Sequence, residues 1–366
     1  MQAFRDLATT GFALSLFASV AFAQSVVELP ANLADPGTQV VNVLTQDPRA
    51  GQNNRNIGFS EGPAVDSAGN LYFSENVVSE LNSPKIWKVT PTGTASVLYE
   101  SSIATNGLEF DPQGRLLAVA NGMVLRFYPN GTRDTLIRNN ILVNLNDLSI
   151  NSSGYVLLTN YTGNKLFLLA PGGVFRDSIT IPGNPNGVEF VESSANNNTI
   201  YLNLTSLGKV VRFNWSSAAS AAFSFYAGTR TDFIPRVANP DGITVDSLGN
   251  FYIVSNSIGT VVVYSPAGDS IGRITVKARS SLNATNCTFG GPGNRTLFIT
   301  GNGGAYKVQM KVPGRKGPGI TTAIHSDRMI RPLNRRVFNV APFDALGRDI
   351  TRWRITGAEK IRILRE

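Results

Sequence analysis

The sequence predicts an all-β fold, a six-bladed β-propeller with a short C-terminal extension that is β-rich or irregular. The main observation is a pattern that occurs six times: a polar side chain, usually followed by Gly, then an alternating apolar run broken by a Gly turn. The copies begin at Glu61, Asn106, Asn146, Asn186, Asp241 and Asn286, at intervals of 40 to 55 residues. Units of this period that hold several short strands are typical of propeller blades.

Each copy continues into further short strands. In the fifth copy, NFYIVS, GTVVVYSP and AGDSIGRITV follow one another over residues 250–276, with Gly, Asn or Pro at the gaps. Such alternation indicates antiparallel strands of about five or six residues, and no stretch shows sustained helical periodicity. Residues 38–45, TQVVNVLT, precede the first copy. We expect them to supply an outer strand that completes the last blade and closes the ring.

The chain divides into three parts. Residues 1–23 combine Arg5, an apolar stretch and Ala21-Phe22-Ala23, which is the form of a secretory signal. An uncleaved anchor is the alternative, but no membrane span is expected after signal cleavage. Residues 24–312 form the predicted propeller and 313–366 a basic extension. The protein is therefore expected to be secreted, periplasmic or on the cell surface.

The formal charge of +8 does not indicate a nucleic-acid binder. Residues 311–366 hold 13 Lys and Arg against 5 Asp and Glu, whereas the preceding 310 residues hold 20 of each. The repeat region is thus neutral and has no basic stripe interleaved with aromatic residues.

The one cysteine and the one histidine of the sequence exclude further classes of site. Cys287 is the only cysteine, so no internal disulfide can form, and its apolar setting indicates a buried thiol rather than a nucleophile. His325 is the only histidine and lies in the basic extension. A histidine-based hydrolase is therefore not expected in the repeat region.

The six polar residues are predicted to form one cluster. Residues at the same position of each blade meet at one end of the channel, which gathers Glu61, Asn106, Asn146 with Asp147, Asn186, Asp241 and Asn286. Carboxylate and amide oxygens are the ligands that a hard cation such as calcium prefers.

A structural interpretation of these residues stays open. Asn-Gly and Asp-Gly are also strong turn signals, and this interpretation is favoured for Asn106 and Asn286. It does not fit Glu61, because Glu is not a turn former. For Asp241 the two interpretations are equal on spacing alone.

Four segments resemble a known family. GFSEGPAVDSAGNLYF, LNDLSINSSG, GNPNGVEF and NPDGITVDSLGNFYI are similar to marker segments of the SMP-30/gluconolactonase/LRE-like family, over about residues 56–310. The resemblance implies a six-bladed propeller with one divalent cation, calcium first and zinc or magnesium as alternatives. It implies Glu61, Asn186 and Asp241 as metal ligands and Asn146 as a contact to metal or substrate. The channel-mouth residues Asn106, Asp147 and Asn286 are possible additional contacts.

The implied activity is hydrolysis of a sugar lactone or small ester. The cation would polarise the carbonyl and orient a water, with Asp241 as candidate general base. A cation-bound carboxylate is a poor base, however, so metal-bound hydroxide is the alternative nucleophile.

The sequence also departs from the family. Asn121-Gly122 stands where many bacterial lactonases carry histidine, and Leu148 with INSSG replaces the usual continuation of the N-D segment. DGITVDSLGNFYIVS further resembles the NHL repeat, so a non-enzymatic propeller that binds a glycan, peptide or protein is the alternative function.

The C-terminal extension resembles a type IX sorting tail. Asp344-Ala-Leu-Gly-Arg348 matches the D-x-x-G-R turn of such tails, which implies export machinery as a partner. A solvated basic extension is the equally weighted alternative.

Overall fold

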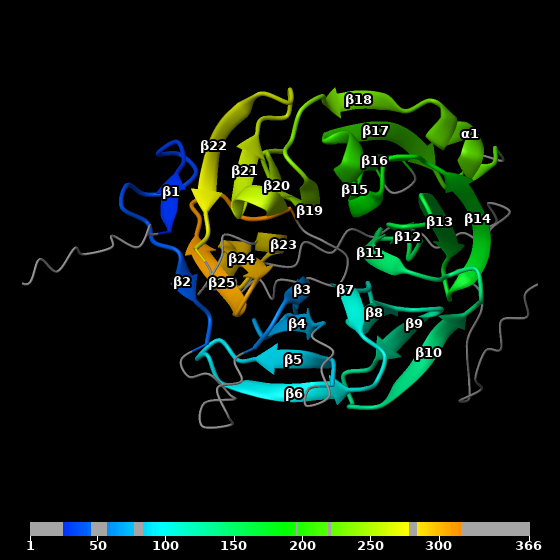
Figure 1. Cartoon of the computed structure of the whole chain (residues 1–366), viewed down its shortest axis with the longest axis horizontal. Coiled ribbons are helices and arrows are strands. Elements are labelled where there is room, and N and C mark those ends of the chain that lie inside the picture. The colour runs from blue at the N-terminus through cyan, green and yellow to red at the C-terminus, as the bar shows by residue number, and fades with distance from the viewer. Residues whose placement is uncertain are drawn as a thin grey trace, which may run out of the picture. The chain divides into compact units, whose positions relative to one another are not determined.

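Six antiparallel sheets surround a central channel (Figure 1). The computed structural model describes residues 25–44, 57–76, 83–194, 197–218, 221–277 and 284–315. The predicted all-β, six-bladed propeller is confirmed. The predicted signal peptide and the predicted sorting tail lie outside the described residues. Within the described residues, no helix has the length and apolar character needed to cross a membrane.

The first three blades follow the sequence from the inner to the outer strand. The first holds β3 (Ser60–Val65), β4 (Leu71–Glu75), β5 (Lys85–Val89) and β6 (Ala95–Glu100). The second holds β7 (Thr105–Phe110), β8 (Leu116–Ala120), β9 (Met123–Phe127) and β10 (Arg133–Arg138). The third holds β11 (Leu145–Ile150), β12 (Val156–Asn160), β13 (Lys165–Ala170) and β14 (Val174–Thr180).

The last three blades carry the additions to the plan. The fourth holds β15 (Pro185–Ser194), β16 (Asn197–Leu204), β17 (Lys209–Ser216) and β18 (Thr231–Ile234). The fifth holds β19 (Pro240–Val245), β20 (Phe251–Ser255), β21 (Thr260–Tyr264), β22 (Ser270–Thr275) and β1 (Val26–Glu28). The sixth holds β23 (Ala284–Gly290), β24 (Thr296–Gly301), β25 (Gly304–Gln309) and β2 (Val41–Asn42).

The N-terminal segment closes the ring. Strand β2 pairs antiparallel with β25, through Val41 opposite Lys307, which confirms the outer strand predicted within residues 38–45. Strand β1 was not predicted; it adds a fifth strand to the fifth blade through Val26 opposite Thr275. Two blades formed by the end of the repeat region are thus held by its beginning, and β22 and β25 are paired rather than exposed as edges where β1 and β2 cover them.

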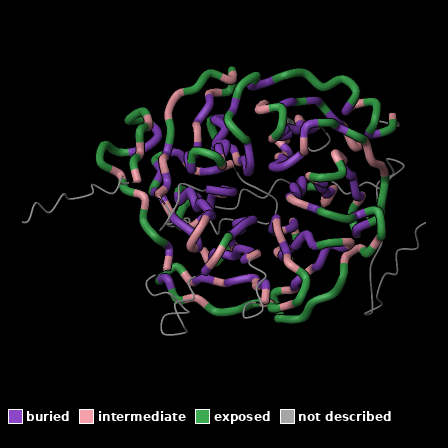
Figure 2. Tube along the Cα trace, in the orientation of Figure 1, coloured by how far each residue is buried: buried purple, intermediate pink, exposed green. Residues whose placement is uncertain are grey.

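Burial follows the order of strands within a blade. The inner strand β3 and its neighbour β4 are buried along their whole length, whereas the outer strand β6 is mostly exposed (Figure 2). Second strands such as β8, LLAVA, are apolar on both faces because neighbouring blades pack face to face. Residues of the first and second blades, including Ile86 and Leu116, form one continuous cluster. This inter-blade packing stabilises the ring without a disulfide.

The ring has two ends. We call the end at which the six inner strands begin the mouth face, and the opposite end the far face. The hairpins between second and third strands also lie at the mouth face, since the first residue of an inner strand pairs with the last of the second strand, as Pro240 does with Ser255. Two of these hairpins contain the 3₁₀ turns η1 (Thr205–Leu207) and η2 (Asn256–Ile258).

The long interval between the fourth and fifth copies does not cover the mouth. Part of it lengthens β15, β16 and β17, and the rest forms helix α1 (Phe223–Gly228) between β17 and β18. Connections between third and fourth strands lie at the far face. Phe223 and Ala227 are buried there, and the Ser224 amide donates to Asp177 Oδ2 at 3.2 Å. The insertion therefore adds helix α1 at this end of the ring rather than a loop at the mouth.

The chain after β25 packs against far-face turns, which include the 3₁₀ turn η3 (Pro292–Asn294). The amide of Ser247 donates to the Pro313 carbonyl at 2.9 Å, and that of Arg315 to the Val245 carbonyl at 2.9 Å. A Cβ at Gly314 would lie 2.1 Å from Phe289 Cβ, so only glycine fits. Residues 313–315, which the sequence assigns to the extension, therefore contact the propeller directly.

Candidate site in the central channel

The inner strands share one irregularity that shapes the channel. Each of β3, β7, β11, β15, β19 and β23 has a register shift close to its start. A β-bulge turns neighbouring side chains out of the regular alternation and is frequent beside functional sites. The six polar positions of the sequence pattern lie at these bulges.

The glycine after the polar residue is required for the blades to meet. Built at Gly62, Gly187 or Gly242, a Cβ would lie 2.3, 2.3 or 2.0 Å from an oxygen of the next blade's polar residue. Asn-Gly and Asp-Gly therefore belong to inner strands rather than to turns, and the turn interpretation is wrong for Asn106 in β7 and Asn286 in β23.

Five of the seven predicted channel-mouth residues are buried together. The exposed fractions are 5% for Glu61, 7% for Asp147, 6% for Asn186, 8% for Asp241 and 8% for Asn286. Electrostatic repulsion links Glu61 with both Asp241 and Asp147, and Asp241 with Asp147. Three carboxylates from the first, third and fifth blades thus converge on the channel.

Amide and hydroxyl groups hold these carboxylates in place. Asn256 Nδ2 donates to Asp241 Oδ2 at 3.0 Å, and Asn186 hydrogen-bonds the same carboxylate. Asn186 Nδ2 also donates to Thr205 Oγ1 at 3.2 Å. The orientation of the Asp241 carboxylate is thereby fixed by residues of the fourth and fifth blades.

A second pair of contacts holds the other two carboxylates. Asn286 Nδ2 donates to Asp147 Oδ2 at 3.4 Å, and the Thr285 hydroxyl hydrogen-bonds Glu61. Every one of these partners is neutral, so none balances the negative charge.

The pKa values reflect this lack of charge compensation. Burial first, and then the charge of Asp147, raises the pKa of Asp241 from 3.8 to about 8. Burial and the charges of Asp241 and Asp147 raise the pKa of Glu61 well above its usual value. Burial raises the pKa of Asp147 to about 7. No cationic side chain contributes to any of these three shifts, so a bound cation would fit the electrostatics of the site.

The donor chemistry limits which cation fits. Within the described ranges, no three His, Cys, Asp or Glu side chains are grouped as a metal site would require. The predicted set instead combines two carboxylates, Glu61 and Asp241, with the amide of Asn186. All three offer oxygen, the donor atom that calcium and magnesium prefer.

The two remaining predicted residues are less buried than this group. Asn106 and Asn146 are half-buried at the starts of β7 and β11. The Asn106 carbonyl accepts a hydrogen bond from Ser74 Oγ at 2.8 Å, which fixes the backbone rather than the side chain. Both amides are therefore accessible at the mouth.

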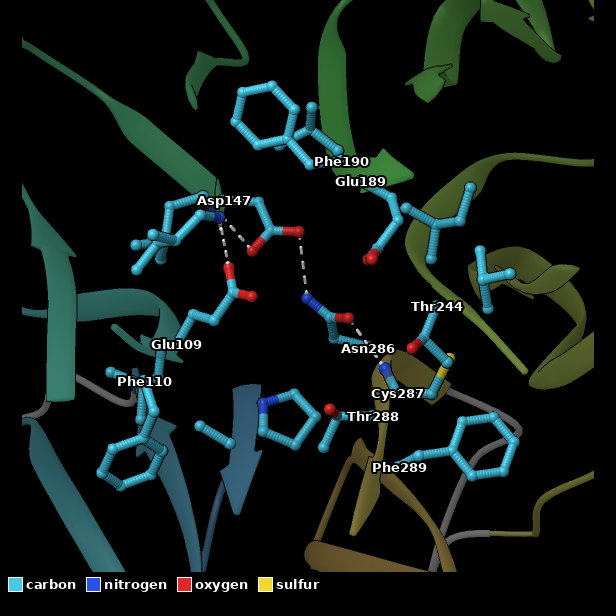
Figure 3. Close-up of a pocket in the computed structure, with 18 of the residues that line it drawn as sticks. Glu109, Phe110, Asp147, Glu189, Phe190, Thr244, Asn286, Cys287, Thr288 and Phe289 are labelled. Atoms are coloured by element: carbon cyan, nitrogen blue, oxygen red, sulfur yellow. Dashed lines mark hydrogen bonds between the residues drawn. The ribbon is translucent and has the colours of Figure 1, made fainter. Parts of the chain in front are cut away.

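A cavity of about 100 Å³ lies in the channel beyond the mouth residues (Figure 3). Figure 3 shows Glu109 and Glu189 in it with Asp147, and the Ile150 amide donates to Glu109 Oε2 at 2.8 Å. Desolvation raises the pKa of Glu189 to about 8, although the charge of Arg315 at the far face opposes this shift. Arg315 also lines the cavity.

Glu109, Glu189 and Arg315 were not predicted from the sequence as site residues. The signal was present in NGLEF and NGVEF, where Glu109 and Glu189 occupy the same position of two repeats. Arg315 has no counterpart in the repeat pattern.

Comparisons with known proteins agree with this architecture. The profile of the SMP-30/Gluconolactonase/LRE-like region matches residues 59–302. Pentonolactonase XacC of Haloferax volcanii is 27% identical over 234 residues, which are 62% of this chain and 76% of that protein.

Two solved structures share the fold. A gluconolactonase from Xanthomonas campestris superposes with a TM-score of 0.61 at 22% identity, over 79% of this chain and 98% of that one. Regucalcin from Agrobacterium tumefaciens, a calcium-binding protein, gives a TM-score of 0.57 at 16% identity, over 72% and 94% of the two chains.

Proposed function

Because the chain belongs to the SMP-30/gluconolactonase/LRE-like family, we propose that it hydrolyses a lactone or small ester with one divalent cation at the channel mouth. The observation that carries the proposal is the burial of Glu61, Asp147 and Asp241, whose charges repel one another across the channel and whose hydrogen-bond partners are all neutral. The lactonase relatives support the reaction class.

Glu61, Asn186 and Asp241 would hold the cation, and calcium fits their oxygen donors best. The cation, when bound, polarises the substrate carbonyl and helps to orient a water. Side chains of the protein would transfer the proton and position the substrate.

Asp241 is the proposed general base. Its carboxylate is oriented by Asn256 and Asn186, and in the cation-free protein its pKa of about 8 lies close to neutrality. A base with a pKa near the working pH transfers protons most efficiently. A nearby positive charge would lower this value, so the balance between ligand and base depends on how tightly Asp241 holds the cation.

Asn146 is the proposed substrate contact. It begins the third blade's inner strand at the mouth, next to the buried Asp147, and its amide is accessible. An amide N–H there would donate to an oxygen of the lactone and orient the carbonyl.

Export remains part of the proposal. It rests on the form of residues 1–23 and on the resemblance of the C-terminal extension to a sorting tail. We propose a secreted, periplasmic or cell-surface enzyme. Deleting residues 316–366 should leave the propeller folded and stop surface delivery, as followed by cell fractionation. Normal delivery of the truncated chain would contradict the sorting role.

Calorimetry of the chelator-treated protein with calcium, zinc and magnesium, paired with a lactone hydrolysis assay, tests the function. We expect calcium to bind wild type and to restore hydrolysis. Glu61→Gln should lose both, whereas Glu100→Gln, the same change on the exposed outer strand β6, should retain both. Absence of cation binding by wild type would overturn the metal site and favour a propeller that binds a glycan, peptide or protein.

A further inference from the structure

Six exposed apolar side chains lie on loops of the mouth face. Their exposed fractions run from 36% to 52%, and the residues are Phe59, Ile103, Ile141, Val143, Leu207 and Ile258. We call this set the apolar rim. Four of its members are on segments that lead into inner strands, and two are in the 3₁₀ turns η1 and η2.

The apolar rim is close to the channel mouth. Phe59, Ile103 and Val143 precede the mouth residues of their own blades by two or three positions. At about 3.3 Å per residue, this places each of them within roughly 10 Å of a mouth residue.

The two turn residues lie near groups that position the candidate ligands. A Cβ at Gly183, three positions before Asn186, would lie 2.8 Å from Leu207 Cδ1, so Leu207 covers the start of the fourth blade. Ile258 shares η2 with Asn256, whose amide holds Asp241 at 3.0 Å. Leu207 is therefore close to the strand that carries Asn186, and Ile258 is two positions from a residue that binds Asp241.

Charge is scarce on the same loops. In the described parts of the mouth-face connections, Arg236 and Lys277 are the charged residues, and the others are mainly Asn, Ser, Thr, Gly and apolar residues. A sugar hydroxyl group that packed against the apolar rim itself would lose its hydrogen bonds to water and gain no partner from those side chains, which is unfavourable. An alkyl chain gains by leaving water at such a surface.

We propose that the apolar rim selects a lactone that carries an alkyl chain over a polyhydroxylated sugar lactone. This inference rests on the proposed lactonase function. The ring of the substrate would sit at the channel mouth, and its chain would lie across Leu207 and Ile258.

The dependence of kcat/KM on chain length tests the proposal. The calcium-loaded full chain is assayed with γ-butyrolactone, γ-octalactone, γ-decalactone and glucono-δ-lactone. Complete burial of one methylene corresponds to about a fourfold gain. Because the rim covers only part of the chain, we expect decalactone to exceed butyrolactone by roughly tenfold or more, and to exceed gluconolactone.

Variants distinguish contacts with the apolar rim from a general preference for more hydrophobic substrates. Leu207→Asn and Ile258→Asn should flatten the chain-length dependence. Leu248→Asn should keep it, because Leu248 is 57% exposed on the β19–β20 turn at the far face. Equal flattening by all three variants, or a preference for gluconolactone, would overturn the rim proposal and leave the lactonase function intact.

A failure of the lactonase function is distinguishable. If no lactone is hydrolysed with any cation, the preference of the apolar rim is tested separately. Calorimetry then compares the binding of γ-decalactone and glucono-δ-lactone to wild type. Tighter binding of decalactone that weakens in Leu207→Asn would support the rim, and equal binding of the two lactones would refute it.

Discussion

Replacement of Asp241 by asparagine should stabilise the protein when no cation is bound. The unfolded chain releases the Asp241 proton at the ordinary value of 3.8, whereas the folded, cation-free protein releases it at about 8. Between these values the folded state binds more protons than the unfolded state, so the free energy of unfolding falls as pH rises. The loss begins near pH 4 and is complete above pH 8.

The size of the effect follows from the two pKa values. Each unit corresponds to about 1.4 kcal/mol, so the shift of Asp241 from 3.8 to about 8 corresponds to an upper limit of the order of 5 kcal/mol at pH 8. Even half of this would raise the melting temperature of a domain of this size by several degrees. The asparagine of the Asp241→Asn variant keeps the volume and an oxygen acceptor but carries no charge.

Thermal unfolding after chelation, measured from pH 5 to pH 8, is the assay. Wild type should lose stability across this range, and Asp241→Asn should lose less and be the more stable protein at pH 8. Asp269→Asn, the same change in an exposed turn, should behave as wild type. Saturating calcium should reverse the order, because a ligand that binds only the folded state stabilises it, and the variant lacks one of the proposed calcium ligands.

Two results would refute this reasoning. A cation-free wild type whose melting temperature is constant from pH 5 to pH 8 would mean that the mouth carboxylates are not desolvated. An Asp241→Asn variant less stable than wild type at pH 8 would mean that the hydrogen bonds of the carboxylate outweigh its uncompensated charge.

Three further predictions concern the same ring. Gly62→Ala should lower the melting temperature severely, since its Cβ would lie 2.3 Å from the Asn106 carbonyl. Gly114→Ala, with open space around it, should lower the free energy of unfolding by only about 1 kcal/mol. Equal losses of stability in the two variants would contradict the packing role of Gly62. Cys287 is buried and its pKa is raised by desolvation, so a thiol reagent should modify it only after unfolding; rapid native labelling would count against this. Asn256→Ala should weaken calcium binding, measured by calorimetry, roughly tenfold; unchanged affinity would exclude its positioning role.

The fold and the mouth residues could be predicted because the sequence repeats. Residues at the same position of each repeat occupy equivalent places in the ring. Six copies at one period place Glu61, Asn186 and Asp241 at equivalent positions before any coordinate is known. The closing strand could be predicted as well, because a ring needs a partner for its last blade.

Other features could not be read from the repeat. Strand β1 is three residues long and belongs to no repeat, so nothing in the pattern assigns it to the fifth blade. Arg315 reaches the channel only because the chain folds back beneath the far face after its last strand.

The length of the insertion between the fourth and fifth copies did not reveal where it lies. Its residues follow the third strand of the fourth blade, and connections after a third strand lie at the far face. The order of strands, rather than the length of the insertion, decides which end of the ring it covers.

The two ends of the described chain leave the ring at opposite faces. Ser25 lies beside the mouth face, where its hydroxyl accepts a hydrogen bond from the Lys277 amide at 2.9 Å, and Arg315 lies at the far face. Immobilisation of the protein on a sensor surface through a tag placed directly before Ser25 would therefore crowd the channel mouth. Attachment directly after Arg315 would turn the channel mouth toward the solution, so a linker at that position is the geometry to choose for display, biosensing or scaffolded catalysis.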